Sequence, residues 1–170
     1  MEDKSQFYIE ALKLEPHPEG GFFSEIYKSD ETINSQCLPA RYNGLRSFST
    51  SIYFLLKEDQ ISYLHKLKSD ELWHFYDGCA TKLYIIDEKG NLSNIVLGRN
   101  LAEGEILQVV IKRNYWFCAE ITDKLSFSLV GCTVSPGFEF DDFEIGKRDE
   151  LLTRFPQHND LIKKFTAVNS

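Results

Sequence analysis

The sequence predicts an all-β fold, a sandwich or barrel, with one short helix near its start and two near its end. Between residues 20 and 140, short segments alternate apolar and polar side chains as β-strands do, and helical periodicity is almost absent. Turn signals such as Asp77-Gly78 and Glu103-Gly104 separate these segments. Aromatic residues make up 14% of the 170 residues, with 13 Phe and 8 Tyr, which also favours strands.

Nine strands are expected from this alternation. They span residues 22–27, 49–56, 62–68, 72–76, 81–86, 93–97, 106–111, 117–121 and 127–132. Residues 4–14 carry apolar side chains at helical spacing before Pro16 and Pro18, which predicts an N-terminal helix. Short helices are expected near residues 148–153 and 159–165. Because no linker, repeat or low-complexity run interrupts the chain, residues 1–170 are predicted to form one domain.

The charge balance excludes two classes of partner. With 19 Lys and Arg against 26 Asp and Glu, the formal net charge is −7 at pH 7. A surface of this sign does not favour nucleic acid or an anionic membrane. The acidic residues are dispersed, and the group Asp141, Asp142 and Glu144 is expected to be a solvated loop.

The cysteines and the N-terminus indicate the compartment. Cys37, Cys79, Cys118 and Cys132 are widely spaced and form no C-x-x-C pair, which argues against a zinc ribbon or a thioredoxin-like site. The first residues lack the basic start and apolar run of a signal peptide, and no run approaches the length of a spanning helix. We therefore expect a cytoplasmic protein with reduced thiols.

A histidine and a glutamate six residues apart mark the predicted site. Alternation places Tyr63 and His65 on one face of their strand, and Glu71, Trp73 and Phe75 on one face of the next. If the strands are neighbours in a barrel, the His65 imidazole and the Glu71 carboxylate can meet inside it. Such a pair can ligate a metal or exchange protons with a substrate.

Five sequence blocks, taken in order, resemble one branch of the cupin superfamily whose function is unknown. These blocks run from Leu14 to Tyr27, Arg46 to Leu56, His65 to Gly78, Gly104 to Trp116 and Leu129 to Phe140. They contain the patterns HPEGG, DExWH and VGCxVxPGFxF, and they define a core of about residues 14–143. The resemblance implies an RmlC-like jelly roll, or double-stranded β-helix, and a homodimer in which residues 22–27 pair across the two-fold axis.

The resemblance also implies which side chains face the interior. In the cupin pattern, three histidines and a glutamate hold a metal. Here His65 and Glu71 stand at two of those positions, while Leu67 and Phe117 occupy the other two. By the same analogy, Tyr63, His65, Trp73, Phe75, Tyr115 and Phe117 point into the barrel. His74 then points outward, unless a bulge near Glu71 reverses the alternation.

RmlC-type sugar-nucleotide epimerases, which this chain resembles in fold, use a histidine base and a tyrosine acid. This implies His65 as base, Tyr63 or Tyr115 as acid, Glu71 as the group that orients the imidazole, and Arg46 as a clamp for an anionic group. Further substrate contacts are expected from Trp73, His74, Phe75, Gln108, Trp116 and Phe117. Since few basic residues lie near these motifs, we expect a small carbohydrate-like or polar metabolite rather than a nucleotide sugar.

Three hypotheses of function stay open at this point. The first is a metal-independent isomerase, epimerase or lyase. The second is a metal-dependent cupin enzyme with His65 and Glu71 as ligands, completed by His74, Gln108 or water. The third is a metabolite-binding module without catalysis. No cofactor is expected under the first and third, and a divalent metal is expected only under the second.

Overall fold

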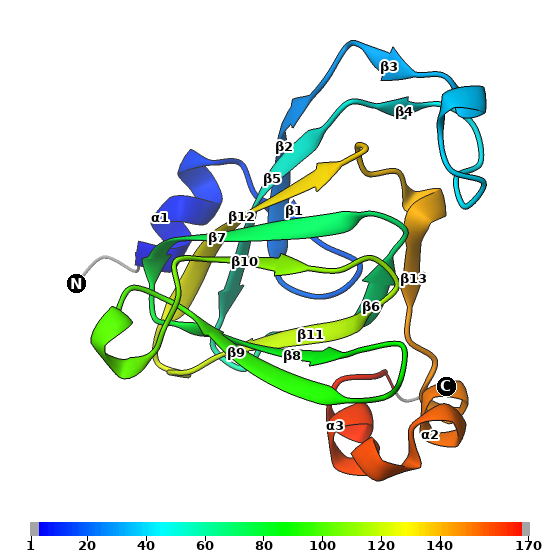
Figure 1. Ribbon diagram of the computed structural model, residues 1–170. Coiled ribbons are helices and arrows are strands. Elements are labelled where there is room, and N and C mark those ends of the chain that lie inside the picture. The colour runs from blue at the N-terminus through cyan, green and yellow to red at the C-terminus, as the bar shows by residue number, and fades with distance from the viewer. Residues whose placement is uncertain (1–3, 168–170) are drawn as a thin grey trace.

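The computed structural model describes residues 4–167, and in it two antiparallel sheets face each other as a jelly-roll barrel (Figure 1). The first sheet has six strands in the order β1 (Glu15–Pro16), β2 (Phe22–Lys28), β5 (Thr50–Lys57), β12 (Phe127–Ser135), β7 (Asp70–Gly78) and β10 (Gln108–Ile111). The second has five, in the order β13 (Phe143–Ile145), β6 (Ile61–Leu67), β11 (Trp116–Ile121), β8 (Thr81–Ile86) and β9 (Leu92–Leu97). A small pair, β3 (Thr32–Ile33) and β4 (Arg46–Ser47), stands apart. The predicted all-β fold is confirmed.

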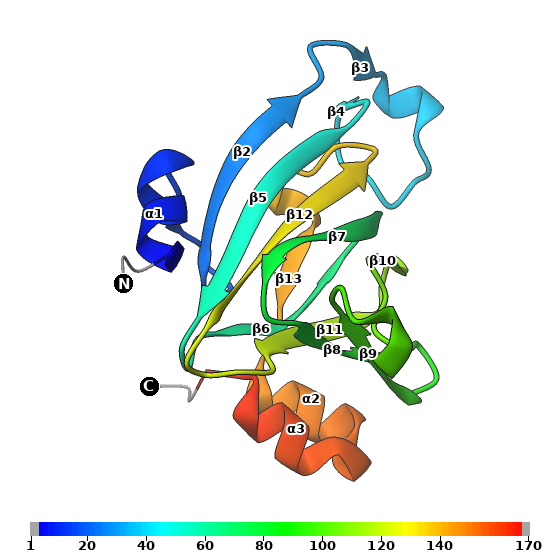
Figure 2. The ribbon, with the colours of Figure 1, turned by 90° about the vertical axis from the view of Figure 1, so that its left-hand side faces the viewer.

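Helices cover the outer faces of both sheets (Figure 2). Helix α1 (Lys4–Ala11) lies beside β2, while α2 (Arg148–Arg154) and α3 (Asn159–Lys164) pack beneath the five-stranded sheet. Single 3₁₀ turns, η1 to η4, span Ser35–Cys37, Leu101–Glu103, Phe140–Asp142 and Pro156–His158. None of the described helices has the length and apolar character needed to cross a membrane.

Strand alternation divides the apolar side chains between the barrel interior and the two outer faces. On β5, Phe54 and Leu56 enter the interior cluster between the sheets, whereas Leu55 packs outward beneath α1. On β11, Phe117 faces the interior and Trp116 packs outward against the C-terminal helices. Strand β11 is therefore buried on both faces, because α2 and α3 cover the outer face of its sheet.

Strand β6 carries a bulge that changes which of its residues face inward. Its pairing with β11 shifts from His65 opposite Phe117 to Ser62 opposite Ala119, so β6 has one residue more than its partner over this stretch. Ser62 and His65 consequently face the same side. The extra backbone groups are bonded elsewhere: Tyr63 N–H donates to the Glu19 carbonyl at 2.7 Å, and Leu64 N–H donates to the Phe165 carbonyl at 2.8 Å.

The turn between β1 and β2 reaches across to this bulge. His17 N–H donates to the Gly21 carbonyl, and Gly20 N–H donates to the His17 carbonyl, both at 3.0 Å. Gly20 has φ 101°, and a Cβ at this position would collide with the carbonyl oxygen of Ile61. Only glycine satisfies both the positive φ and this close approach, and so the turn brings Glu19 against β6.

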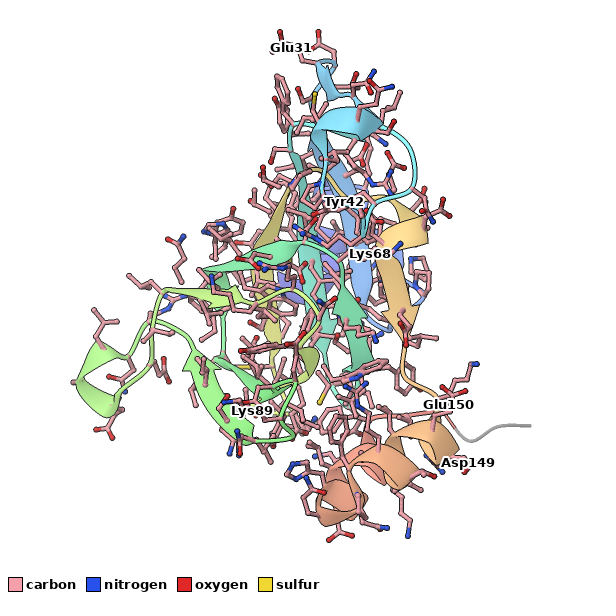
Figure 3. All side chains as sticks on the ribbon, turned by 45° about the vertical axis from the view of Figure 1, so that its right-hand side comes forward. Glu31, Tyr42, Lys68, Lys89, Asp149 and Glu150 are labelled. Carbon is pink, nitrogen blue, oxygen red and sulfur yellow. The ribbon has the colours of Figure 1, made fainter. Side chains whose placement is uncertain are left out.

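An ion pair buried beneath β4 fixes the segment that follows β12. Arg46 donates to both carboxylate oxygens of Asp142, at 2.6 and 2.7 Å, and each side chain is only 3% exposed. Lys68 Nζ lies 3.5 Å from the same carboxylate, and Figure 3 shows Lys68 close to Tyr42, whose ring lies under the Arg46 guanidinium. Asp142 is therefore not part of a solvated loop, and Arg46 is not free to clamp a substrate. Both sequence-based expectations are wrong.

The homodimer stays a prediction. Strand β1 pairs with only Phe22 and Phe23 of β2, and Ile26 and Tyr27 are exposed farther along the same strand.

Replacing Arg46 by Met is expected to lower the free energy of unfolding by about 3–5 kcal/mol, because Asp142 then stays buried without its main partner. Lys28→Ala removes an ion pair to Glu139 in which both side chains are 40% exposed, and it should cost less than about 1 kcal/mol. Urea denaturation measures both values. The double variant Arg46→Met/Asp142→Leu should recover part of the loss, and equal losses in the two single variants would contradict this account.

Gly20→Ala should destabilise the protein more than Gly104→Ala. Both glycines have positive φ, which costs alanine about 1–2 kcal/mol, but a Cβ at Gly104 would meet nothing within 4 Å. We expect Gly20→Ala to cost at least about 2 kcal/mol more, measured by urea unfolding, since its methyl group must displace the Ile61 carbonyl. Equal costs would mean that the close approach has no energetic weight.

Candidate functional site

A cavity of about 90 Å³ lies inside the barrel, between the β1–β2 turn and the segment after β12. Its polar lining comes from both sheets and the turn: His17, Glu19, Glu25, Thr50, His65, Glu71 and Cys132. Its apolar lining consists of Phe23, Ile52, Leu67, Val134, Phe138, Phe140 and Phe143. Glu25 and Phe140 are exposed, and they mark the mouth.

The centre of the cavity is a contact between Glu19 and His65. Glu19 Oε2 lies 3.1 Å from His65 Nε2, and both side chains are at least nine-tenths buried. The other carboxyl oxygen, Oε1, accepts a hydrogen bond from the Ser62 hydroxyl at 3.0 Å. Rings of Phe117 and Phe143 lie against the imidazole, with centroids at 4.0 and 5.3 Å.

Hydrogen bonding fixes how many protons this pair holds. His65 Nδ1 lies 2.7 Å from the Tyr63 carbonyl, which can only accept, so Nδ1 carries a proton. The Nε2–Oε2 contact then needs one further proton, held either by the carboxyl group or by the imidazole. Burial raises the pKa of Glu19 well above its usual value and lowers the pKa of His65 to about 3. The neutral form, a carboxylic acid donating to a neutral imidazole, is therefore favoured.

His17 lies on the other side of Glu19. Its Nδ1 accepts a hydrogen bond from the Glu19 backbone N–H at 3.2 Å, and it lies 3.7 Å from Glu19 Oε2. Burial lowers the pKa of His17 to about 4, so this imidazole is also neutral at neutral pH. An edge-to-face contact with Phe23, with centroids 4.5 Å apart, helps to hold the ring.

Glu71 supplies a second acidic group, from β7 of the six-stranded sheet. Burial raises its pKa to about 7, an effect that the nearby Trp73 indole and Cys132 thiol partly offset. Glu71 Oε2 and Trp73 Nε1 are nevertheless both buried without a partner in hydrogen-bond geometry among the described residues. Glu71 is 7% exposed and is one of the residues that line the cavity.

The structure brings some of the sequence-predicted residues together in this cavity. His65 and Glu71 both line it, and Phe117 packs on His65 from behind. Trp73 is 1% exposed and packs in the interior cluster against Phe54. The group that contacts the His65 imidazole is Glu19 rather than Glu71, which corrects the expectation that Glu71 orients it.

Neither predicted tyrosine lines the cavity. The bulge in β6 breaks the alternation between Tyr63 and His65, so only the carbonyl of Tyr63 reaches the site. Tyr115 lies in the turn between β10 and β11, where it is half-buried and packs against the interior cluster, outside the cavity lining. Tyr115 faces the interior as expected, but neither tyrosine is among the residues that line the cavity with His65, so the expected tyrosine acid is not placed there.

The remaining candidates also lie outside the cavity. His74 is on the outer face of β7, 3.4 Å from the Thr133 hydroxyl, and exposed Gln108 pairs opposite it in β10. Trp116 faces the C-terminal helices, with Lys66 Nζ 4.6 Å from its ring centroid. Phe75 packs at the edge of the interior cluster beneath Arg99.

The donor groups in this arrangement do not fit a resident divalent metal. Both ring nitrogens of His65 contact protein oxygens, and the two further cupin ligand positions are Leu67 and Phe117. Within residues 4–167, no three His, Cys, Asp or Glu side chains are placed to hold one metal ion. His65 and Glu71 alone make an incomplete ligand set.

The site residues predicted from the sequence do not include His17 or Glu19, whose block is interpreted first as a turn and alternatively as part of the pocket rim. They belong to the block His17-Pro18-Glu19-Gly20-Gly21, which local rules predict to be a turn, and it is one. The available signal was the glutamate itself, because a turn that has two glycines does not require an acidic side chain beside them.

Comparisons with known proteins agree with this architecture. The family model described as Cupin superfamily (DUF985) matches residues 6–146. A Shewanella oneidensis protein known from its crystal structure is 37% identical, with TM-score 0.88, and the match covers 99% of this chain and 100% of that one. A hypothetical protein from Leishmania major is 33% identical, with TM-score 0.84 and coverage of 96% and 98%.

A more distant likeness concerns the fold alone. Oxalate decarboxylase from Bacillus subtilis is 15% identical with TM-score 0.54, and the match covers 91% of this chain and 37% of the decarboxylase. The comparison with curated proteins yields no match. The barrel topology, the family match over residues 6–146 and the full-length likeness to two solved structures lead to one conclusion: the chain belongs to the cupin superfamily, in the family designated DUF985.

Proposed function

We propose that the protein catalyses metal-independent proton transfer on a small molecule in the barrel cavity, as isomerases, epimerases and lyases do. The observation that carries the proposal is the 3.1 Å contact between Glu19 Oε2 and His65 Nε2, in the same cavity as Glu71, whose Oε2 has no hydrogen-bond partner among the described residues. Reactions of this class need one group that accepts a proton from carbon and another that returns one.

The two groups divide these tasks. Glu71 suits the base, because its Oε2 has free lone pairs and a pKa of about 7 leaves a large fraction ionised at neutral pH. The Glu19–His65 pair suits the acid, because it holds one proton in either of its forms. This assignment differs from the sequence-based expectation that His65 is the base and a tyrosine the acid.

In the proposed step, a C–H bond next to a carbonyl group breaks and its proton passes to Glu71. The electron pair delocalises into the substrate carbonyl. A new C–H or O–H bond then forms with the proton from the Glu19–His65 pair, and exchange with solvent resets both groups. The cavity of about 90 Å³ is smaller than the roughly 300–1,000 Å³ typical of drug-sized ligands, which favours a small metabolite.

In D2O, the protein is expected to catalyse the replacement of a carbon-bound hydrogen by deuterium in at least one of a panel of small hydroxy- and amino-carbonyl compounds. Proton NMR measures the rate of this exchange. Glu71→Gln and His65→Asn should each slow this exchange by about 10²–10⁴-fold, because each removes one proton-transfer group. His74→Asn changes a histidine on the outer face of β7 and should leave the rate unchanged.

Two outcomes would contradict the proposal. Compounds that bind without any exchange would favour the metabolite-binding module. About one equivalent of transition metal in the purified protein, lost in both His65→Ala and Glu71→Ala, would favour the metal-dependent enzyme.

The change in the free energy of unfolding caused by Glu71→Gln should be more favourable at pH 8 than at pH 4.5. The folded-state pKa of Glu71, about 7, lies above its ordinary value of 4.5, so the folded state gains stability from the proton below pH 4.5 and loses that gain as the pH rises through 7. The glutamine variant lacks this loss, which is on the order of 3 kcal/mol. Urea unfolding of both proteins at the two pH values measures the difference, and a difference independent of pH would refute the assignment.

A further inference from the structure

The charged groups that line the cavity are all acidic. Glu19, Glu25 and Glu71 contribute three carboxyl groups, and no Lys or Arg is among the lining residues. Basic residues near the mouth are already paired within the described part of the chain. Arg46 and Lys68 bind Asp142, and Lys28 binds Glu139.

An anionic ligand would therefore enter a site that offers it no counter-charge. A carboxylate or phosphate would have to approach Glu71 and pass Glu25 at the mouth, and like charges in a poorly solvated site repel each other strongly. The two histidines do not offset this, because burial lowers the pKa of both His17 and His65 and keeps them neutral.

Buried Glu71 requires the opposite kind of partner. It is more than nine-tenths buried, it lines the cavity, and its Oε2 has no hydrogen-bond partner among the described residues. Burying a carboxylate whose two oxygens are not both hydrogen-bonded is costly, and a ligand that brings a positive charge near it removes part of that cost.

The mouth is built from aromatic rings that suit a positive charge. Phe138, Phe140 and Phe143 contact one another edge to face, with centroids separated by 5.1 Å for Phe138 and Phe140, 6.3 Å for Phe138 and Phe143, and 6.4 Å for Phe140 and Phe143. Phe140 is 57% exposed although it is a large apolar side chain. Ring faces attract ammonium groups, and exposed Glu25 lies at the same mouth.

We propose that the cavity takes a small organic cation, a protonated amine. Its ammonium group lies among the rings of Phe138, Phe140 and Phe143 beside Glu25, and its reacting end is directed toward Glu71. The inference rests on the proposed function only in using the same cavity as the substrate site. It deepens that function by naming the charge class of the substrate. The Arg46–Asp142 pair takes part indirectly, because it fixes the segment that carries the three rings.

Three probes of similar size and different charge distinguish the effect of charge on affinity from the effect of shape. Ethanolamine is cationic, ethylene glycol is neutral and glycolate is anionic. Their equilibrium affinities for the full-length protein are measured by calorimetry and thermal shift at pH 8, where Glu71 is mainly ionised and ethanolamine is protonated. Ethanolamine should bind at least about tenfold more tightly than ethylene glycol, and glycolate should bind more weakly than both.

Variants at the mouth locate the charge. Glu25→Gln should weaken ethanolamine binding about three- to tenfold and leave ethylene glycol binding unchanged. Glu103→Gln is the matched control, because Glu103 is an exposed glutamate on η2, away from the cavity lining, and it should change neither affinity. Phe140→Leu keeps an apolar side chain but removes a ring, and it should weaken ethanolamine more than ethylene glycol.

Tighter binding of glycolate than of ethanolamine, or equal binding of ethanolamine and ethylene glycol, would overturn the proposal. So would an equal effect of Glu25→Gln and Glu103→Gln on ethanolamine. These results are independent of catalysis. A neutral or anionic compound that binds and exchanges its C–H in D2O would remove the cation assignment and leave the proton-transfer function. Selective binding of amines, with no C–H exchange in any bound compound, would remove the proton-transfer function and leave the cation assignment.

Discussion

The cost of burying charge determines how this barrel is organised. Two neighbouring sites in the fold reduce that cost in different ways. Asp142 is buried with a bidentate arginine partner, and this ion pair holds the segment after β12 in place. Glu19 and Glu71 are buried with no cation among the lining residues, so their pKa values rise instead. The first arrangement stabilises the fold, and the second supports the proton-transfer function that we propose.

Aromatic packing around His65 further lowers the polarity of the site. Phe117 and Phe143 enclose the His65 imidazole and exclude water from its contact with Glu19. The same exclusion that favours the neutral pair also destabilises the folded chain relative to an apolar interior. Sites that are tuned for function commonly carry such a cost, and the surrounding strands must over-determine the geometry for it to persist.

Much of the architecture could be predicted from the sequence, whereas the partner of His65 could not. All nine predicted strands exist, because apolar alternation over four or more residues is a strong signal. The missed strands β1, β3, β4 and β13 have two or three residues each, too few to show a period. The bulge in β6 depends on tertiary hydrogen bonds, and it changed the orientation of Tyr63. Glu19 contacts His65 from a turn that its two glycines alone are enough to predict, so the prediction of the turn gives no separate signal for this contact.

The bulge in β6 also connects the site to both ends of the chain. Its two freed amide groups are bonded by Glu19, near the N-terminus, and by Phe165, beyond the region that the family model covers. The His65 imidazole follows directly after these residues. Shortening the chain behind β13 would uncover the outer face of the five-stranded sheet and also leave the Leu64 amide without its acceptor. The C-terminal segment therefore supports the geometry of the site through the backbone of β6, although none of its side chains lines the cavity.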